Sequence, residues 1–192
     1  VREALKVSRE TLGDRHPSTL WSMRVLGMLL YAKDDLACAE PLLREALEVS
    51  RETLGNRHPD TLISISDIGK LLRAKGDFAT AEPLLREALE VQRETLGDRH
   101  PNTLDSLNNL GRLLKEKGDL AAAEPLSREA LEGRREKLGA RHPDTLSSIS
   151  NLGLLLMAKG DLAAAEPLLR EALEGRREVL GARHPKTLAA SK

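Results

Sequence analysis

Aromatic residues and cysteine are scarce in this sequence of 192 residues, which has one Trp, one Tyr, one Phe and one Cys. Cys38 has no partner for an intrachain disulfide, so we interpret it as a small packing residue and expect a reducing, cytoplasmic location. With so few aromatics, the core must consist of Leu and Ala, which form helices readily. No stretch alternates between apolar and polar residues as strands do. The sequence therefore predicts an all-α protein.

Net charge is also missing, because 30 Lys and Arg residues balance 30 Asp and Glu residues. A neutral chain has no general electrostatic attraction to nucleic acid or to an anionic membrane. No apolar run is long enough to span a bilayer. We therefore expect neither nucleic acid nor a membrane as a partner.

Catalytic and metal-binding patterns are absent as well. The sequence contains no phosphate-binding loop, nucleophile elbow or catalytic Cys/His pairing. The five histidines are spread one to a repeat, and neighbouring helices in a stack lie about 10 Å apart, so two histidines could hardly share a metal ion. We expect no enzyme activity, no metal and no cofactor, and we interpret the histidines as caps of the helices that follow them.

What the sequence does contain is a strict internal repeat. The tripeptide Arg-His-Pro occurs five times at intervals of 42 residues, beginning at Arg15, Arg57, Arg99, Arg141 and Arg183. A period of this size indicates stacked copies of one supersecondary unit. We expect a single array with a half repeat at 1–19, full repeats at 20–61, 62–103, 104–145 and 146–187, and a stub at 188–192. Because the chain begins and stops within a repeat, we interpret it as a segment of a longer array.

Each repeat reads as two helices, as the fourth shows. Pro143 suits the first turn of a helix, and apolar residues then recur at helical spacing from Leu146 to Leu156. Gly160 is a typical helix stop and Asp161 a typical N-cap. We expect the second helix to run from Leu162 to Leu180 and to end at Gly181.

The residues of the fourth repeat also resemble a known family. Leu152-Gly153 between Ile149 and Leu156, followed by Ala165-x3-Leu169, resembles the tetratricopeptide repeat pattern. The 42-residue length, with Ala-Glu-Pro-Leu and Leu-Gly-x-x-His-Pro, is similar to the repeats of kinesin light chains. The resemblance implies a right-handed α-solenoid (a superhelix of helix-turn-helix units) and a non-catalytic scaffold that binds peptides in a concave groove lined by the first helices. The glycine positions of the pattern, where we expect the two helices to approach closely, are Gly27, Gly69, Gly111 and Gly153.

Four positions of the repeat vary most, namely the second, fifth, ninth and twelfth, and we refer to them as the variable positions. Between the last two full repeats nine residues differ, and four of these lie at the variable positions. The four positions share one stripe of a helix, opposite the Leu stripe. In the order of the repeats, the residues are Trp21, Arg24, Met28 and Tyr31; Ile63, Ser66, Lys70 and Arg73; Asp105, Asn108, Arg112 and Lys115; and Ser147, Ser150, Leu154 and Met157.

We interpret this stripe as a binding surface for a protein or peptide, since the resemblance places these positions in the groove. It also implies that Asn109 and Asn151, at the sixth position, bond a peptide backbone. Basic residues in the middle repeats and apolar ones at both ends favour a partner with an acidic centre and apolar flanks. Two alternatives remain open. The stripe could have drifted without constraint, although the constancy of the second helices favours recognition, or the array could associate head to tail through its uncapped ends.

Overall fold

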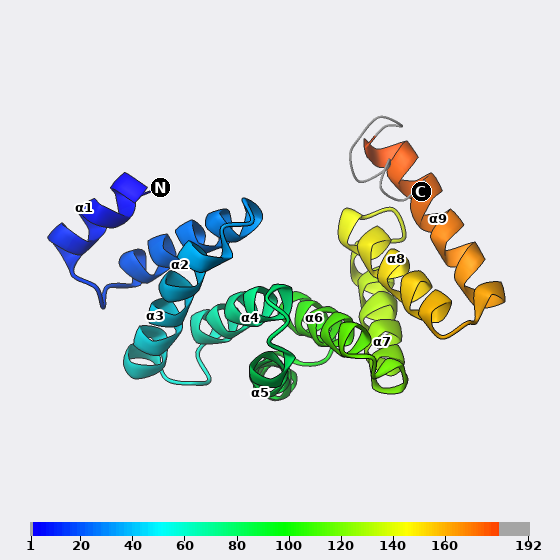
Figure 1. The fold of residues 1–192 in the computed structure, drawn as a ribbon, viewed down its shortest axis with the longest axis horizontal. Coiled ribbons are helices and arrows are strands. Elements are labelled where there is room, and N and C mark those ends of the chain that lie inside the picture. Colours follow the sequence, from blue (N-terminus) through cyan, green and yellow to red (C-terminus); the bar gives the residue numbers. More distant parts are fainter. Residues whose placement is uncertain (1, 181–192) are drawn as a thin grey trace. The chain divides into compact units, whose positions relative to one another are not determined.

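The computed structural model describes residues 2–180, which form nine helices and no strand (Figure 1). The prediction of an all-α protein is confirmed. The helices are α1 (Arg2–Leu12), α2 (Pro17–Ala32), α3 (Leu36–Leu54), α4 (Pro59–Ala74), α5 (Phe78–Leu96), α6 (Pro101–Lys117), α7 (Leu120–Leu138), α8 (Pro143–Ala158) and α9 (Leu162–Leu180). The expected helix stop at Gly181, the last Arg-His-Pro link and the stub at 188–192 lie outside the described residues.

The chain divides into two compact units, Val1–Val91 and Gln92–Lys192, and the division falls inside α5. In the first unit α2 packs against α1, α3 and α4. In the second unit α8 packs against α6, α7 and α9. Each unit is thus built from consecutive helix pairs in which a first helix also contacts the first helix of the next pair.

The histidine of each described link caps the first helix that follows. Its backbone is extended, as the proline after it requires, and its Nδ1 accepts a hydrogen bond at 3.2 Å from the backbone N–H two residues later. The pairs are His16 with Ser18, His58 with Asp60, His100 with Asn102, and His142 with Asp144. This confirms the interpretation of these histidines as caps, and it explains why one stands before the proline that begins each of these first helices.

An aspartate is the N-cap of the second helices α3, α7 and α9, and the residue before it has a left-handed backbone conformation. The Asp161 side chain accepts a hydrogen bond from the N–H of Ala164 at 3.1 Å, and Gly160 before it has a φ of 84°. Asp35 caps α3 through the N–H of Cys38 in the same way. A left-handed backbone conformation favours glycine, so the predicted stop at Gly160 and cap at Asp161 are confirmed.

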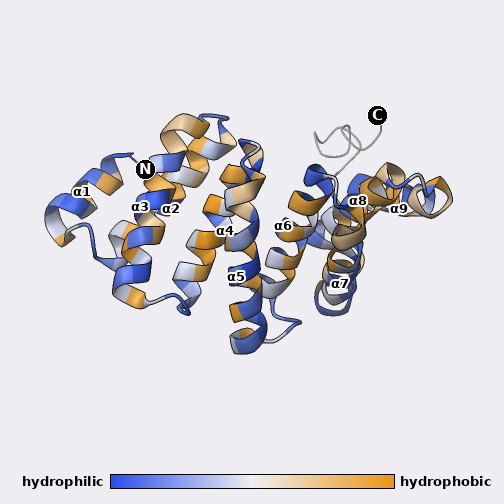
Figure 2. Cartoon of the chain, turned by 60° about the horizontal axis from the view of Figure 1, so that its bottom comes forward, coloured by the Kyte–Doolittle hydropathy of each residue, from blue (hydrophilic) through white to orange (hydrophobic). Residues whose placement is uncertain are grey.

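The core lies between the helices of each pair and is made mainly of Leu, Ile and Ala. In Figure 2 the interhelical links are hydrophilic, whereas apolar residues occupy parts of every helix. The glycines of the repeat pattern allow the close approach that the sequence predicts. A methyl group on Gly69 would lie 2.6 Å from Leu85, and one on Gly111 would lie 2.8 Å from the Ser127 hydroxyl.

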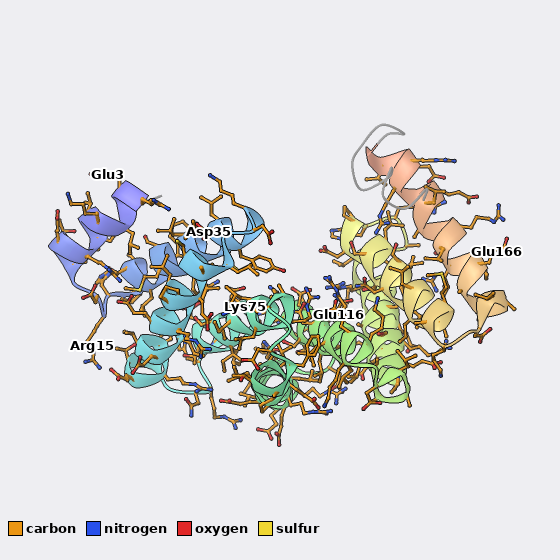
Figure 3. All side chains as sticks on the ribbon, viewed as in Figure 1. Glu3, Arg15, Asp35, Lys75, Glu116 and Glu166 are labelled. Atoms are coloured by element: carbon orange, nitrogen blue, oxygen red, sulfur yellow. The ribbon has the colours of Figure 1, made fainter. Side chains whose placement is uncertain are left out.

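Ion pairs connect successive second helices at a fixed offset of 36 residues. The pairs are Arg9 with Glu45, Arg51 with Glu87, Arg93 with Glu129, and Arg135 with Glu171. Arginines of the links also bond glutamates, namely Arg15 with Glu52, Arg99 with Glu136 and Arg141 with Glu178. Figure 3 labels Arg15 in the link between α1 and α2. Glu40 and Glu124 bond both the arginine four residues on and a lysine at the end of the next first helix.

The constancy of the second helices therefore has a structural cause. Several of their charged residues bond neighbouring repeats, and others bond a residue four positions away in the same helix. These contacts constrain the charged residues, so their constancy does not show how fast an unconstrained surface changes. The contrast between constant second helices and variable first helices therefore does not distinguish selection for binding from unconstrained change at the variable positions.

Candidate partner-binding faces

The variable positions differ in exposure. Trp21 is exposed at 62%, and Leu154 and Met157 are exposed at 38% and 47%. Exposed or partly exposed are Trp21, Arg24, Met28, Tyr31, Ile63, Lys70, Arg73, Asp105, Asn108, Arg112, Lys115, Ser147, Leu154 and Met157, together with Asn151 at the sixth position. Buried are Ser66, Ser150 and the sixth-position Asn109. The first helices therefore present most, but not all, of the candidate side chains to solvent.

In the first unit the charged side chains of Arg24, Asp67 and Lys70 form a cluster. The Arg24 Nε donates to the Asp67 carboxylate at 3.2 Å, from α2 to α4, and the Lys70 Nζ lies 3.3 Å from the other oxygen of Asp67. Asp67 is only 5% exposed. One carboxylate thus serves two cations, which leaves this cluster with an excess of one positive charge.

The second unit has a neutral counterpart of the Arg24–Asp67 pair. The Asn151 amide nitrogen donates to the Asn108 side-chain oxygen at 2.8 Å, from α8 to α6. Both pairs join the fifth position of one repeat to the sixth position of the next, 43 residues apart. Asn151 keeps its own oxygen and one N–H free of this bond, so it retains capacity for another hydrogen bond.

Sequence reasoning missed these two connections. At the sixth position Asp67 replaces asparagine where the partner is an arginine. The signal was present in the sequence, because Arg24 changes to Asn108 as Asp67 changes to Asn151.

Asp105, at a variable position, bonds a cation that sequence reasoning did not single out. Its carboxylate accepts from Arg134 of α7, which is 6% exposed. Arg134 also donates to the Ser148 hydroxyl at 2.7 Å and to the Asp144 backbone oxygen at 3.1 Å. The guanidinium therefore connects α6, α7 and α8, and Asp105 has a partner within the chain.

A small cavity of about 50 Å³ adjoins Trp21 in the first unit. We name it the Trp21 niche. It is lined by Pro17, Leu20, Trp21, Arg24, Ser50, Leu54 and Asp60.

Neighbouring charges shift the pKa of two glutamates and of the cysteine. Lys75 and then Arg44 lower the pKa of Glu40, and Lys159 and then Arg128 lower that of Glu124, so both carboxylates are ionised at neutral pH. Asp35 raises the pKa of the exposed Cys38 thiol, which weakens it as a nucleophile. Within residues 2–180, no cluster of three His, Cys, Asp or Glu residues could hold a metal ion.

No helix in the described part of the chain combines the length and the hydropathy needed to cross a bilayer.

Comparison with known proteins gives matches along most of the chain. One sequence model of the tetratricopeptide repeat matches residues 1–51, 26–94 and 66–136, and a second model of this repeat matches residues 145–186. No curated protein sequence matches.

Solved structures with similar folds also match. A protein of Podosopora anserina, described as a putative kinesin light chain with nearly identical TPR-like repeats, matches in two crystal structures. One of them has 26% identity and a TM-score of 0.75, over 93% of this chain and 84% of that one. The other has 26% identity and a TM-score of 0.72, over 92% and 84%. BtubC (BKLC) of P. vanneervenii has 24% identity and a TM-score of 0.78, over 96% and 73%, which shows the fold alone.

Proposed function

Because the chain belongs to the tetratricopeptide repeat family, we propose that it is a non-catalytic interaction module that binds an extended segment of a protein partner on its first helices. One observation carries the proposal. The first helices pack side by side within each unit, α2 with α4 and α6 with α8, while most variable positions on them remain accessible. On the second helices, in contrast, several charged residues bond neighbouring repeats.

The chemistry of the variable positions favours a partner with acidic residues between apolar ones. The cluster of Arg24, Asp67 and Lys70 carries an excess positive charge, which attracts a carboxylate. Trp21 in the first repeat and Met157 in the fourth offer exposed apolar surface, and aromatic and Met side chains are common in binding surfaces.

The test removes one cation from a first helix in each unit. A variant with Lys70→Met and Arg112→Met lacks two cations without placing a new carboxylate beside Asp67. The matched control, Arg86→Met with Arg128→Met, removes two cations from second helices, where each bonds a glutamate four residues earlier. Peptides selected on the wild-type protein from a displayed random library are then titrated against all three proteins.

We expect the selected peptides to be rich in Asp and Glu and to bind the first variant at least about tenfold more weakly, since each lost charge-assisted contact contributes about 1.5–3 kcal/mol. The control should bind as the wild type does. Equal affinity for both variants would show that the first helices do not carry the binding surface.

A second candidate function is self-association, and the face formed by α8 and α9 favours it. Met157, Leu162, Ala165, Leu169 and Leu173 line a hollow of about 440 Å³ there, together with Glu166 and Arg170. In the preceding repeat the positions equivalent to Leu169 and Leu173 are buried, where α7 packs against α8. Among the described residues nothing covers the α8–α9 face, so a helix of a second copy would fit it.

Light scattering after size exclusion tests this candidate. If copies stack, the mass should rise with protein concentration, and Leu162→Glu should restore the monomer. Val179→Glu, on the same helix but outside the hollow, is the control. A monomer at every concentration would exclude self-association and leave the peptide-binding proposal standing.

A further inference from the structure

The third repeat contains an internal binding site for a guanidinium group. Arg134, at the thirty-first position of its repeat, is held by the Asp105 carboxylate, the Ser148 hydroxyl and the Asp144 backbone oxygen. These are the contacts that a planar guanidinium favours, because its N–H groups reach several acceptors at once.

The first repeat has two of these three acceptors but no arginine. Ser50 stands at the position of Arg134, and Asp60 and Ser64 stand at the positions of Asp144 and Ser148. In the absence of a guanidinium, the Ser64 hydroxyl donates to the Asp60 backbone oxygen at 3.0 Å. Since serine is much smaller than arginine, the Trp21 niche remains open at this place.

Trp21 stands at the position of Asp105, so an indole ring takes the place of a carboxylate beside the niche. The indole is 62% exposed and borders the niche together with Asp60. A guanidinium stacks well on an indole face, and the Asp60 carboxylate supplies a negative charge beside it. Arg24 also borders the niche, and its Nε bonds the Asp67 carboxylate of α4.

We propose that the Trp21 niche binds an arginine side chain of a protein partner, in the place that Arg134 fills from within the chain two repeats later. The proposal rests on the function proposed above, since it adds an arginine to the features of the bound segment. It concerns a separate part of α2 and is tested separately.

The chain's single tryptophan makes the niche directly observable. N-acetyl-arginine amide is titrated while the fluorescence of Trp21 is followed, and the citrulline, lysine and leucine amides serve as probes of other chemistry. For one side chain we expect a saturable change with a dissociation constant of about 1–10 mM. The neutral citrulline amide should bind at least about fivefold more weakly, because charge-assisted hydrogen bonds are the stronger ones.

Three variants show where the probe binds. Ser50→Arg should fill the niche from within and abolish the response, and Ser50→Gln, with the residue that the second repeat has as Gln92, should weaken it if the arginine variant does not fold. Asp60→Asn should weaken binding about threefold, as loss of a partly exposed charge does. Asp144→Asn, the matched change where Arg134 already fills the site, should leave the Trp21 response unchanged.

Equal responses to the arginine and citrulline amides would overturn the proposal, and so would a Ser50→Arg protein that responds like the wild type. A stronger response to the leucine amide would show an apolar niche and overturn it too. None of these results depends on Lys70 or Arg112, so failure here is distinguishable from failure of the peptide-binding test.

Discussion

The Arg24 guanidinium and the Asp67 carboxylate bond at 3.2 Å across the contact between α2 and α4. Asn108 and Asn151 make the equivalent bond between α6 and α8. Two first helices in contact therefore use a charged pair in one unit and a neutral pair in the other at the same place.

This equivalence predicts that the two pairs are interchangeable. Arg24→Asn alone should lower the free energy of unfolding by about 1–3 kcal/mol, because Asp67 is buried and loses a partner. Arg24→Asn with Asp67→Asn should recover most of this loss. Urea unfolding of the single and double variants measures the coupling, and a purely additive result would mean that the pair does not stabilise the contact.

Removal of the Arg134 side chain should be more damaging than removal of its carboxylate partner. Arg134→Ser loses bonds to three groups and opens a cavity, so we expect a loss of about 2–4 kcal/mol. Asp105→Asn should cost less than this, since the amide oxygen can still accept from Arg134 and the bonds to Ser148 and Asp144 remain. Thermal unfolding followed by circular dichroism ranks the two variants, and the reverse order would contradict this account of the site.

The glycines at the helix crossings predict a graded response to alanine. Gly69→Ala would force its methyl group against Leu85 at 2.6 Å, and we expect a loss of about 1–3 kcal/mol from overpacking. Gly111→Ala meets the smaller Ser127 and should cost less. Chemical unfolding at equilibrium measures both, and Gly69→Ala with Leu85→Ala should cost less than the sum of the two single changes, because the truncated side chain makes room for the new methyl group.

Stability should fall in acid partly through Glu40 and Glu124. Their folded pKa values lie below the usual 4.5, chiefly because of Lys75 and Lys159. A carboxyl with a depressed pKa stabilises the fold above its unfolded pKa, and this contribution is lost as the pH falls through the folded value. Melting temperatures should therefore change little from pH 7 to about pH 5 and decline below about pH 4.5.

The lysine variants isolate this effect. Lys75→Met with Lys159→Met should lower the melting temperature more at pH 7 than at pH 3, where the carboxyl groups are already protonated. Lys33→Met with Lys137→Met, which removes two exposed lysines outside these pairs, is the control. An equal decrease at both pH values would mean that the two glutamates do not contribute in this way.

Much of the fold was predictable because the repeat makes the same local choice several times. The His-Pro helix starts, the Asp caps and the glycines at close approaches depend on residues within one helix pair. Arg24–Asp67 and the burial of Arg134 were not predicted, because they depend on which side chain the neighbouring repeat presents. The Trp21 niche was not predicted either. It exists because Ser50 is small, and its possible occupant becomes evident only from Arg134, which stands at the same position two repeats later.

The fixed offset of the arginine–glutamate pairs has a consequence for the copy number of the repeat. If the whole repeat at residues 62–103 were deleted, Arg51 would meet Glu129 in place of Glu87. The series of arginine–glutamate pairs between second helices would then remain complete. Arg24 would meet Asn109 in place of Asp67 and exchange a charge pair for a neutral hydrogen bond. Gain or loss of whole repeats thus preserves the arginine–glutamate pairs between neighbouring second helices. It alters the contacts between first helices that differ from one pair of repeats to the next.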